Sequence, residues 1–202
     1  MKDKFYQLPR DKRERMIEAG YRVFAKNEYK RASMSAIADA AGISKSLLFY
    51  YFTNKKELYL FLVSNALYLT QKTARQYRVS ETKDFFEMLC RNLKAKCSLS
   101  VKYPYISAFS LKAYYEQNPE VKKDVCRLID KQNQIGRHEF LESMDGSLFR
   151  EDIDLEMMFQ EITLACEGYL YHTYHEGWID FGQVEKDFGD LITHWKNIYL
   201  KR

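Results

Sequence analysis

The segment that most constrains this chain runs from Ser33 to Lys55 and reads SMSAIADAAGISKSLLFYYFTNK. Its small, apolar and glycine positions fit a helix-turn-helix, in which two short helices cross closely around a tight junction. Gly42 is expected at that junction, because the turn needs a positive φ that glycine adopts without steric cost. Ala38, four residues earlier, is small enough for the second helix to cross close to the first. The segment therefore predicts a DNA-binding motif.

Both short helices have a predicted cap and share a small apolar core. Ser33 and Ser44 precede the helices, and each side chain can accept from backbone amides two or three residues later. The positions expected to point inward are Ile37, Ala41, Ile43, Leu48 and Tyr51. An ordinary helix pair inside a bundle can show the same spacing, so the flanking sequence matters. Apolar residues recur at helical spacing between Arg13 and Phe24, which predicts a first helix that completes a three-helix head.

A longer set of positions around the motif follows a known pattern: Arg13, Ile17, Ala19, Phe24, Asn27, Tyr29, Ile37, Ala38, Ala41, Gly42, Ile43, Ser44, Lys45, Leu48, Tyr51, Phe52, Lys55, Glu57 and Leu58. With these residues the chain resembles the N-terminal domain of the TetR/AcrR family of transcriptional regulators. Four positions depart from the family pattern, namely Glu28, Leu47, Phe49 and Tyr50. Phe49 lacks a tyrosine hydroxyl that in the family often touches a DNA phosphate.

Charge is distributed unevenly along the chain. Residues 1–60 hold 13 Lys and Arg against 7 Asp and Glu, a net charge of +6, whereas residues 61–202 hold 19 against 21, a net charge of −2. A basic head favours a polyanion, because each neutralised phosphate releases condensed counterions. A run such as Arg10 to Arg15 can instead be a solvated helix face. The asymmetry between the two parts favours DNA binding by the first.

Three side chains are predicted to read bases. The second helix of the motif should enter the major groove by its N-terminal turn, where Lys45, Ser46 and Leu47 project. Lys45 can donate to guanine, Ser46 can pair with several base edges, and Leu47 offers apolar contact to a thymine methyl.

Other residues of the head are predicted to contact the DNA backbone. Tyr50 is expected to meet a phosphate, and Tyr51 to meet a phosphate or to lie in the core. Ser33, Ser35 and Ser44 offer contacts at the starts of the two helices. The family resemblance implies that Lys55 also reaches the DNA backbone.

The rest of the chain reads as further helices, and the fold is predicted to be all-α with about nine helices. The expected ranges after the motif are a long helix that includes Leu58 to Leu69, then 85–99, 105–115, 118–141, a helix from Asp152 or Asp154 to Tyr174 stopped by Gly177, and 181–199. We expect a DNA-binding domain at 1–53 and an effector-binding and dimerisation domain at 54–202.

Aromatic residues in the second part predict a pocket for a small hydrophobic or aromatic effector, because they combine apolar faces with hydroxyls. The candidates are Tyr105, Phe109, Tyr114, Phe159, Glu161, Glu167 and Tyr171. The aromatic residues can instead belong to the core or to a dimer interface. A carboxylate buried among them would need a partner, either a cationic ligand or a neighbouring lysine.

The family resemblance implies a homodimer made mainly by the last two long helices. The interface candidates are Tyr169, Trp178, Leu191, Trp195 and Tyr199. Two-fold symmetry then predicts a palindromic operator in double-stranded DNA. By the usual behaviour of the family, the chain is expected to be a repressor released from DNA when the effector binds and shifts the helix after the motif. The sequence itself is also compatible with an activator.

Other chemistry has weaker support. Cys90, Cys97, Cys126 and Cys166 lack paired spacing and are expected to be small buried hydrophobes, with a redox sensor at Cys90 and Cys97 as the alternative. His172 and His175 beside Glu176 suit a solvated helix end better than a metal site. We expect no catalytic residue, metal or cofactor, since no enzyme motif is present.

The sequence also bears on localisation and on two alternative functions. Without a signal peptide or a long apolar run, the chain is expected to be cytoplasmic and to have no membrane partner. An α-helical enzyme or ligand carrier that keeps the motif as a scaffold would bind DNA weakly. A nonspecific nucleoid-type binder would explain the basic head but not the aromatic second part.

Overall fold

The structure is a computed structural model that describes residues 2–176 and 180–201, and within these ranges the side chains of 4–172 and 180–201. Ten α-helices and two short 3-10 helices are its regular elements over those ranges, which confirms the predicted all-α fold. Contacts divide the chain into two compact units. Unit 1 comprises Met1–Leu69 and Ser100–Gln132, and unit 2 comprises Thr70–Leu99 and Asn133–Arg202.

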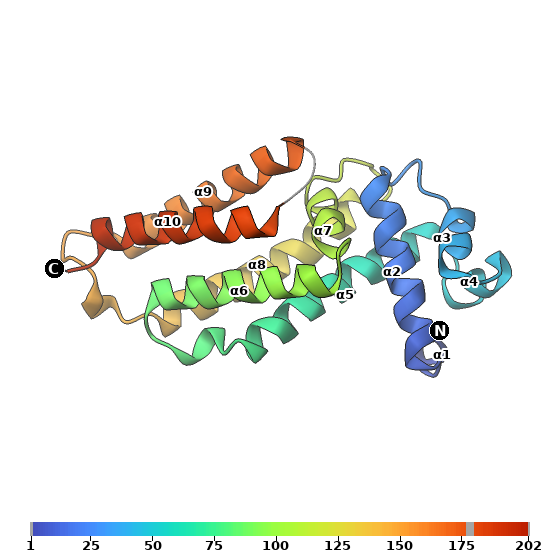
Figure 1. Cartoon of the computed structure of the whole chain (residues 1–202), viewed down its shortest axis with the longest axis horizontal. Helices are drawn as coiled ribbons and strands as arrows, with labels where there is room; N and C mark the ends of the chain where they lie inside the picture. Colours follow the sequence, from blue (N-terminus) through green and yellow to red (C-terminus); the bar gives the residue numbers. More distant parts are fainter. Residues whose placement is uncertain (1, 177–179, 202) are drawn as a thin grey trace. The chain divides into compact units, whose positions relative to one another are not determined.

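Unit 1 contains the helix-turn-helix and the helices that support it (Figure 1). Its helices are α1 (Lys2–Tyr6), α2 (Arg10–Lys26), α3 (Met34–Ala41), α4 (Lys45–Tyr51), the first part of α5 (Lys55–Gln76), α7 (Ile106–Tyr114) and the first part of α8 (Lys122–Ser143). Helix α2 packs against α3 and α7, and α4 contacts α3 and α1. A Cβ on Gly20 of α2 would lie 2.7 Å from a methyl carbon of Leu62, so glycine permits the close packing of α2 on α5.

Aromatic rings form much of the core of unit 1. Phe109 of α7 is fully buried, with ring centroids of Tyr21 and Tyr59 at 5.1 and 5.4 Å. Phe24 and Tyr29 complete the cluster against Tyr59, at 4.8 and 5.0 Å. The prediction that Phe109 binds an effector is therefore corrected, because its ring is enclosed by the rings of α2 and α5.

Unit 2 is built on a second apolar core. Its elements are the end of α5, η1 (Val79–Glu81), most of α6 (Phe85–Lys102), the end of α8, η2 (Gly146–Leu148), α9 (Leu155–Glu176) and α10 (Phe181–Tyr199). Helices α9 and α10 lie side by side (Figure 1) and share this core. Its buried members are Val79, Phe85, Phe86, Met88, Phe149, Met158, Ile162, Ile192, Trp195 and Tyr199.

Helix boundaries agree with the sequence where a cap marks them. Helix α10 spans the predicted residues, and Asp180 caps it by accepting from the amides of Gly182 and Gln183. Asp154, rather than Asp152, precedes α9 and accepts from the amides of Glu156 and Met157 at 2.9 and 3.1 Å. The predicted stop at Gly177 lies outside the described residues.

One predicted start is wrong by about one turn. The sequence predicts Asn118 as the cap of a helix whose first turn contains Pro119 and Glu120, whereas α8 begins at Lys122. Asn118 caps a turn instead, because its side chain accepts from the amide of Glu120 at 3.0 Å and its carbonyl accepts from the amide of Val121 at 3.1 Å.

The contact-based units do not follow the predicted domain boundary after residue 53. Helices α5, α6 and α8 each have residues in both units. The functional division at 53 stays a prediction. Among the described helices, none is long and apolar enough to cross a membrane.

Candidate nucleic-acid interface

Local backbone geometry defines the helix-turn-helix. Gly42 has φ 66° and ψ 37°, the left-handed region, and its amide donates to the carbonyls of Ala38 and Asp39. Ser33 caps α3 by accepting from the amide of Ala36, and Ser44 caps α4 by accepting from the amide of Leu47, both at 3.1 Å. The predicted turn and both predicted caps are confirmed. These contacts fix the direction in which α4 leaves the turn.

The inner face of the motif is closed. Ile37, Ala38 and Leu48 are fully buried. Tyr51 is 8% exposed, and its ring centroid lies 5.7 Å from that of Phe5 in an edge contact. The sequence left Tyr51 between a core role and a phosphate contact, and the structure places its ring in the core.

The outer face of α4 carries the predicted base readers. Lys45 and Ser46 are exposed, and Leu47 is 37% exposed. Two aromatic residues continue this face, since Phe49 is 40% and Tyr50 55% exposed. The Lys45 ammonium lies 5.9 Å from the centroid of the Phe49 ring. This surface therefore combines a cation with apolar and aromatic groups, the types of group that contact base edges and phosphates.

Lys55 has a structural role that sequence reasoning missed. Its Nζ donates to the carbonyls of Tyr29, Lys30 and Ala32 at 2.8, 3.3 and 3.0 Å. It also lies 4.4 Å from the centroid of the Tyr29 ring. An ammonium has three donors, so these carbonyls can occupy all of them. Lys55 thus ties the loop between α2 and α3 to the start of α5, and no sequence pattern signals this, because its acceptors are backbone oxygens.

The same loop is linked to the turn before α8. The Tyr29 hydroxyl donates to Glu120 Oε1 at 2.8 Å, and burial together with this carboxylate raises the pKa of Tyr29. Nearby, Lys56 Nζ lies 2.7 Å from Asp124 Oδ2, and this hydrogen bond lowers the pKa of Asp124. These contacts join the motif to α8 within unit 1.

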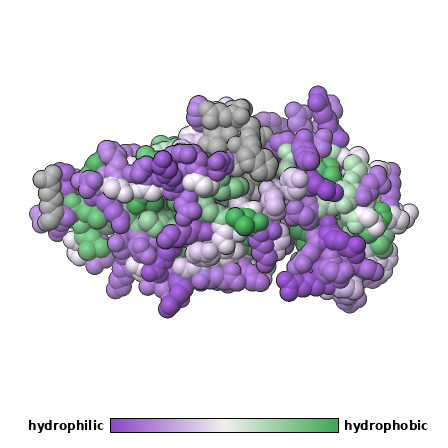
Figure 2. Space-filling model, in the orientation of Figure 1, coloured by the Kyte–Doolittle hydropathy of each residue, from purple (hydrophilic) through white to green (hydrophobic). Residues whose placement is uncertain are grey.

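Charged residues of α2 are partly paired within the helix. Arg10 contacts Glu14 at 2.8 Å, and Arg15 contacts Asp11 at 3.5 Å. Hydrophilic residues predominate over α1 and α2 in Figure 2. The run from Arg10 to Arg15 therefore forms a solvated, partly neutralised helix face, the alternative raised for it from the sequence.

The predicted effector residues of unit 1 have different surroundings. Tyr105 is half-buried, and the Lys26 ammonium lies 5.6 Å from its ring centroid. Tyr114 is 39% exposed and its ring contacts Tyr115 at 5.0 Å. Phe109 lies in the core, as described above.

The remaining effector candidates belong to unit 2. Phe159 is half-buried, with the ring centroids of Phe85 and Phe140 at 6.1 and 6.2 Å. Glu161 and Tyr171 are exposed, whereas Glu167 is half-buried. Phe159 packs against the apolar core of the unit, and Glu161 forms a side-chain hydrogen bond with Tyr199 of that core.

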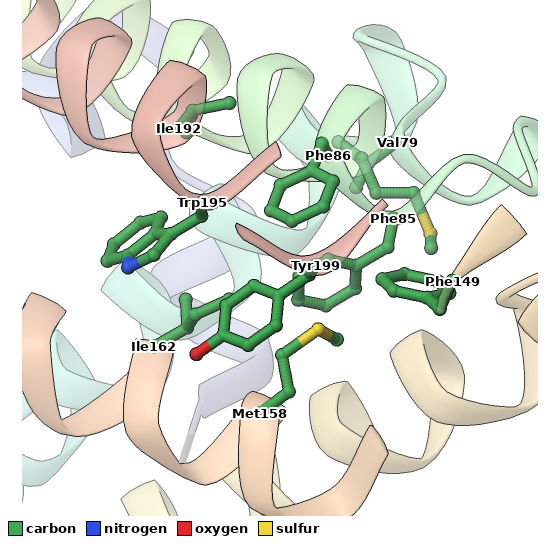
Figure 3. Packing of buried hydrophobic residues seen from close by; sticks show 10 residues of the cluster. Val79, Phe85, Phe86, Phe149, Met158, Ile162, Ile192, Trp195 and Tyr199 are labelled. Carbon is green, nitrogen blue, oxygen red and sulfur yellow. The ribbon is translucent and has the colours of Figure 1, made fainter. Parts of the chain in front are cut away.

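Two of the predicted interface residues lie inside the chain's own core. Trp195 and Tyr199 are 4% and 7% exposed, and Figure 3 shows both rings pointing into the core beside Ile162. Their assignment to a dimer interface is corrected, because these side chains already cover α6 and α9. Leu191 is half-buried, Tyr169 donates to Asp187 Oδ2 at 2.6 Å, and Trp178 lies outside the described residues.

Helix α9 instead exposes an apolar stripe that the sequence pattern did not single out. Met157, Leu164 and Tyr171 are 60%, 59% and 50% exposed and recur every seven residues. Gly168 lies between the last two, and a Cβ added there would meet nothing within 4 Å. Exposure along one helix face is the signal here, and a sequence pattern alone cannot tell such a face from a buried one.

The surroundings of the cysteines and histidines bear on the redox and metal sites considered from the sequence. Burial raises the pKa of the thiols of Cys90, Cys97 and Cys166, which disfavours the reactive thiolate, whereas Cys126 is exposed. No group of three metal-binding side chains occurs among the residues that the structure describes. His172 is exposed, and the side chain of His175 lies outside that set.

Comparisons with known proteins agree with this geometry. Residues 16–61 match the model of the bacterial regulatory proteins of the tetR family. The chain is 46% identical over 55 residues to the HTH-type transcriptional activator FasR of Mycolicibacterium smegmatis. That alignment covers 27% of this chain and 25% of FasR, so it spans about a quarter of that relative.

Solved structures extend the similarity to the fold of most of the chain. The fatty acid degradation regulator FadR from Bacillus halodurans superposes with a TM-score of 0.69 at 18% identity, covering 89% of this chain and 96% of that one. The transcriptional regulator FadR from Bacillus subtilis, in complex with stearoyl-CoA, gives 0.67 at 17% identity, with the same two coverages. The ketosteroid transcriptional regulator KstR2 of Mycobacterium tuberculosis gives 0.66 at 17% identity, covering 97% and 98%.

Proposed function

We propose, from the premise that this chain belongs to the tetR family of bacterial regulatory proteins, that it is a sequence-specific, ligand-responsive transcriptional regulator. It binds a palindromic operator as a homodimer and is released by a small hydrophobic effector, which makes it a repressor. It acts in the cytoplasm and catalyses no reaction.

The observation that carries the proposal is the rigid presentation of the N-terminal turn of α4. Gly42 and Ser44 fix the direction of α4, and Leu48 holds its inner face in the core. Lys45, Ser46 and Leu47 are thereby exposed at one place on the surface. Such a preorganised helix can enter a major groove without a further loss of conformational entropy. Tyr50, Ser33, Ser35 and Ser44 remain proposed backbone contacts.

Selection from a random DNA pool tests this function. The full chain is incubated with the pool at physiological salt, and the bound duplexes are sequenced over several rounds. We expect enrichment of one palindrome whose half-sites lie about one helical turn apart, because two-fold symmetry places two copies of α4 in successive grooves. An unenriched pool would contradict specific reading and would support the nonspecific binder or the enzyme with a scaffold motif.

The homodimer is proposed to form through α9 and α10, with the exposed stripe of α9 at its centre. Met157 and Leu164 offer exposed apolar surface, and the partly exposed ring of Tyr171 continues it along the same face of α9. Gly168 would let the backbone of a second copy approach closely. Of the residues predicted from the sequence, Tyr169 and Leu191 remain candidates for this interface, and the prediction for Trp178 lies outside the described residues.

The effector is proposed to be hydrophobic. The candidates for its site are Phe159 and Glu167 if it binds in unit 2, or Tyr105 and Tyr114 if it binds in unit 1. Two relatives in fold are a fatty acid degradation regulator and a regulator in complex with stearoyl-CoA, which supports an acyl chain as the first ligand to test. Stearoyl-CoA added to the complex with the selected duplex should release the DNA. Retention of DNA at saturating stearoyl-CoA would contradict an acyl-CoA effector, and KstR2 makes a sterol the next ligand class.

A further inference from the structure

The short helix α1 is anchored to the helix-turn-helix by one aromatic residue. Phe5 is 2% exposed, and its ring centroid lies 5.7, 5.2 and 5.2 Å from those of Tyr51, Phe52 and Phe61. Edge and tilted ring contacts of this kind stabilise packing beyond the area that they bury. Phe5 therefore holds α1 against the end of α4 and the first turns of α5.

The residues on both sides of Phe5 lie at the surface. Lys4 is exposed, and its ammonium lies 5.1 Å from the ring centroid of Tyr50, the exposed tyrosine of α4. Arg13 fixes the end of α1, because its Nη1 donates to the carbonyl of Tyr6 at 2.6 Å. The anchor thus sets a positive charge directly beside the outer face of α4.

We propose that α1 is a second DNA-contacting element, in which Lys4 binds a phosphate next to the one that Tyr50 contacts. This inference rests on the proposed function, since it requires the outer face of α4 to lie on DNA. An ammonium above an aromatic ring at an exposed site is held weakly and keeps its N–H donors for another partner. A phosphate oxygen offers a charge-assisted hydrogen bond, which is stronger than that ring contact. Lys4 can therefore bind phosphate without losing a strong contact within the chain.

A salt titration with matched variants tests the contact. Binding of a labelled duplex of mixed sequence is measured by fluorescence anisotropy at several salt concentrations, with the unmodified chain, Lys4→Ala, Lys4→Arg and Lys201→Ala. The salt slope is the slope of the logarithm of the binding constant against the logarithm of the salt concentration. One lost phosphate contact should reduce its magnitude by about 1 and weaken binding about five-fold near 0.15 M salt. Lys201 is an exposed lysine of unit 2, so Lys201→Ala controls for net charge. We expect that control and Lys4→Arg to match the unmodified chain.

The outcomes separate this inference from the proposed function. If Lys4→Ala behaves like Lys201→Ala while the unmodified chain binds DNA, the α1 contact is overturned and the proposed function stands. If the unmodified chain binds no duplex, the proposed function fails and this inference fails with it.

The anchor provides an independent test. Phe5→Ala should release α1 and reduce the magnitude of the salt slope as Lys4→Ala does. The double variant should show little further loss, because both substitutions remove the same phosphate contact. Circular dichroism checks that the helix content is retained. Additive losses in the double variant would overturn the role of α1 in carrying Lys4 to DNA.

Discussion

At the scale of single residues, a substitution at Leu47 can distinguish a base contact from a packing role. Its side chain is 37% exposed on α4, next to the fully buried Leu48. We expect Leu47→Ala to relax the preference at one base step of the selected operator, because an apolar contact with a thymine methyl is lost. Affinity for a mixed-sequence duplex should stay nearly unchanged. Repeating the selection with this variant measures both, and a uniform loss on every sequence would show that Leu47 supports the fold instead.

Lys55 is the residue for which sequence and structure differ most. The family resemblance implies a DNA backbone contact, whereas the structure engages its ammonium with the carbonyls of Tyr29, Lys30 and Ala32. Because those donors are already occupied, we expect Lys55→Met to leave the salt slope of DNA binding unchanged. It should lower the free energy of unfolding by about 1–3 kcal/mol, because the partly buried carbonyls of Tyr29 and Ala32 lose hydrogen bonds to a charged group. Urea denaturation measures that loss.

The adjacent lysine is the control for this change. Lys56 is 38% exposed in its ion pair with Asp124, and exposed pairs contribute little, so Lys56→Met should cost less than about 1 kcal/mol. If Lys55→Met instead reduces the magnitude of the salt slope by about 1 and leaves the stability unchanged, Lys55 contacts a DNA phosphate as the family resemblance implies.

At the scale of elements, the turn between α3 and α4 depends on the backbone of Gly42. A Cβ there would meet nothing within 4 Å, so the φ of 66° alone makes a substitution unfavourable. We expect Gly42→Ala to destabilise the chain by about 1–2 kcal/mol, since residues with a Cβ are strained in the left-handed region. Thermal or urea unfolding checks the value.

Gly136, unlike Gly42, lies in backbone that alanine can adopt without strain. It lies inside α8, where an added Cβ would also meet nothing within 4 Å, and it has no positive φ. Gly136→Ala should therefore stabilise the chain by up to about 1 kcal/mol, because alanine has the higher helix propensity. Equal effects of the two substitutions would show that backbone conformation does not decide either one.

Elements that depend on local rules were predictable from the sequence. The turn at Gly42, the caps Ser33 and Ser44, and the span of α10 follow from residue types at fixed offsets, which need no knowledge of distant contacts. Helix α1 was missed, because five residues show no helical period and its anchor Phe5 packs on residues about fifty positions away.

The effector and interface assignments were wrong where they depended on which surface an apolar side chain packs against. Periodicity identifies the apolar face of α10, yet it does not say whether α9 or a second copy covers that face. Trp195 and Tyr199 therefore read as interface residues but lie in the core of unit 2, and Phe109 lies in that of unit 1. For the same reason, the sequence does not distinguish the exposed stripe with Leu164 from a buried helix face.

At the scale of the whole molecule, regulation needs a connection between effector and DNA. An effector changes operator affinity only if it binds the DNA-competent and released states with different affinities. Helix α5 begins at Lys55, directly after the motif, and contributes residues to both units. The links from Tyr29 to Glu120 and from Lys56 to Asp124 tie the motif to the start of α8. These contacts are the first places to look for changes when the effector binds.

Dimer formation underlies the proposed palindromic operator, and a substitution at Leu164 tests it. The side chain is 59% exposed, so Leu164→Glu should leave the fold of the chain unchanged. In a two-fold dimer centred on this stripe it would place like charges in an apolar contact, which is strongly unfavourable. We expect the variant to sediment with the monomer mass of 24.1 kDa and to lose its preference for a palindrome over a single half-site.

Ile135→Glu is the matched control, because Ile135 is an apolar residue of α8 that is 38% exposed. That variant should keep the mass and the operator preference of the unmodified chain. A dimer that survives Leu164→Glu would place the interface on another face. Palindrome binding by a monomeric Leu164→Glu chain would mean that each head reads its half-site alone, and the operator would then owe its symmetry to something other than a preformed dimer.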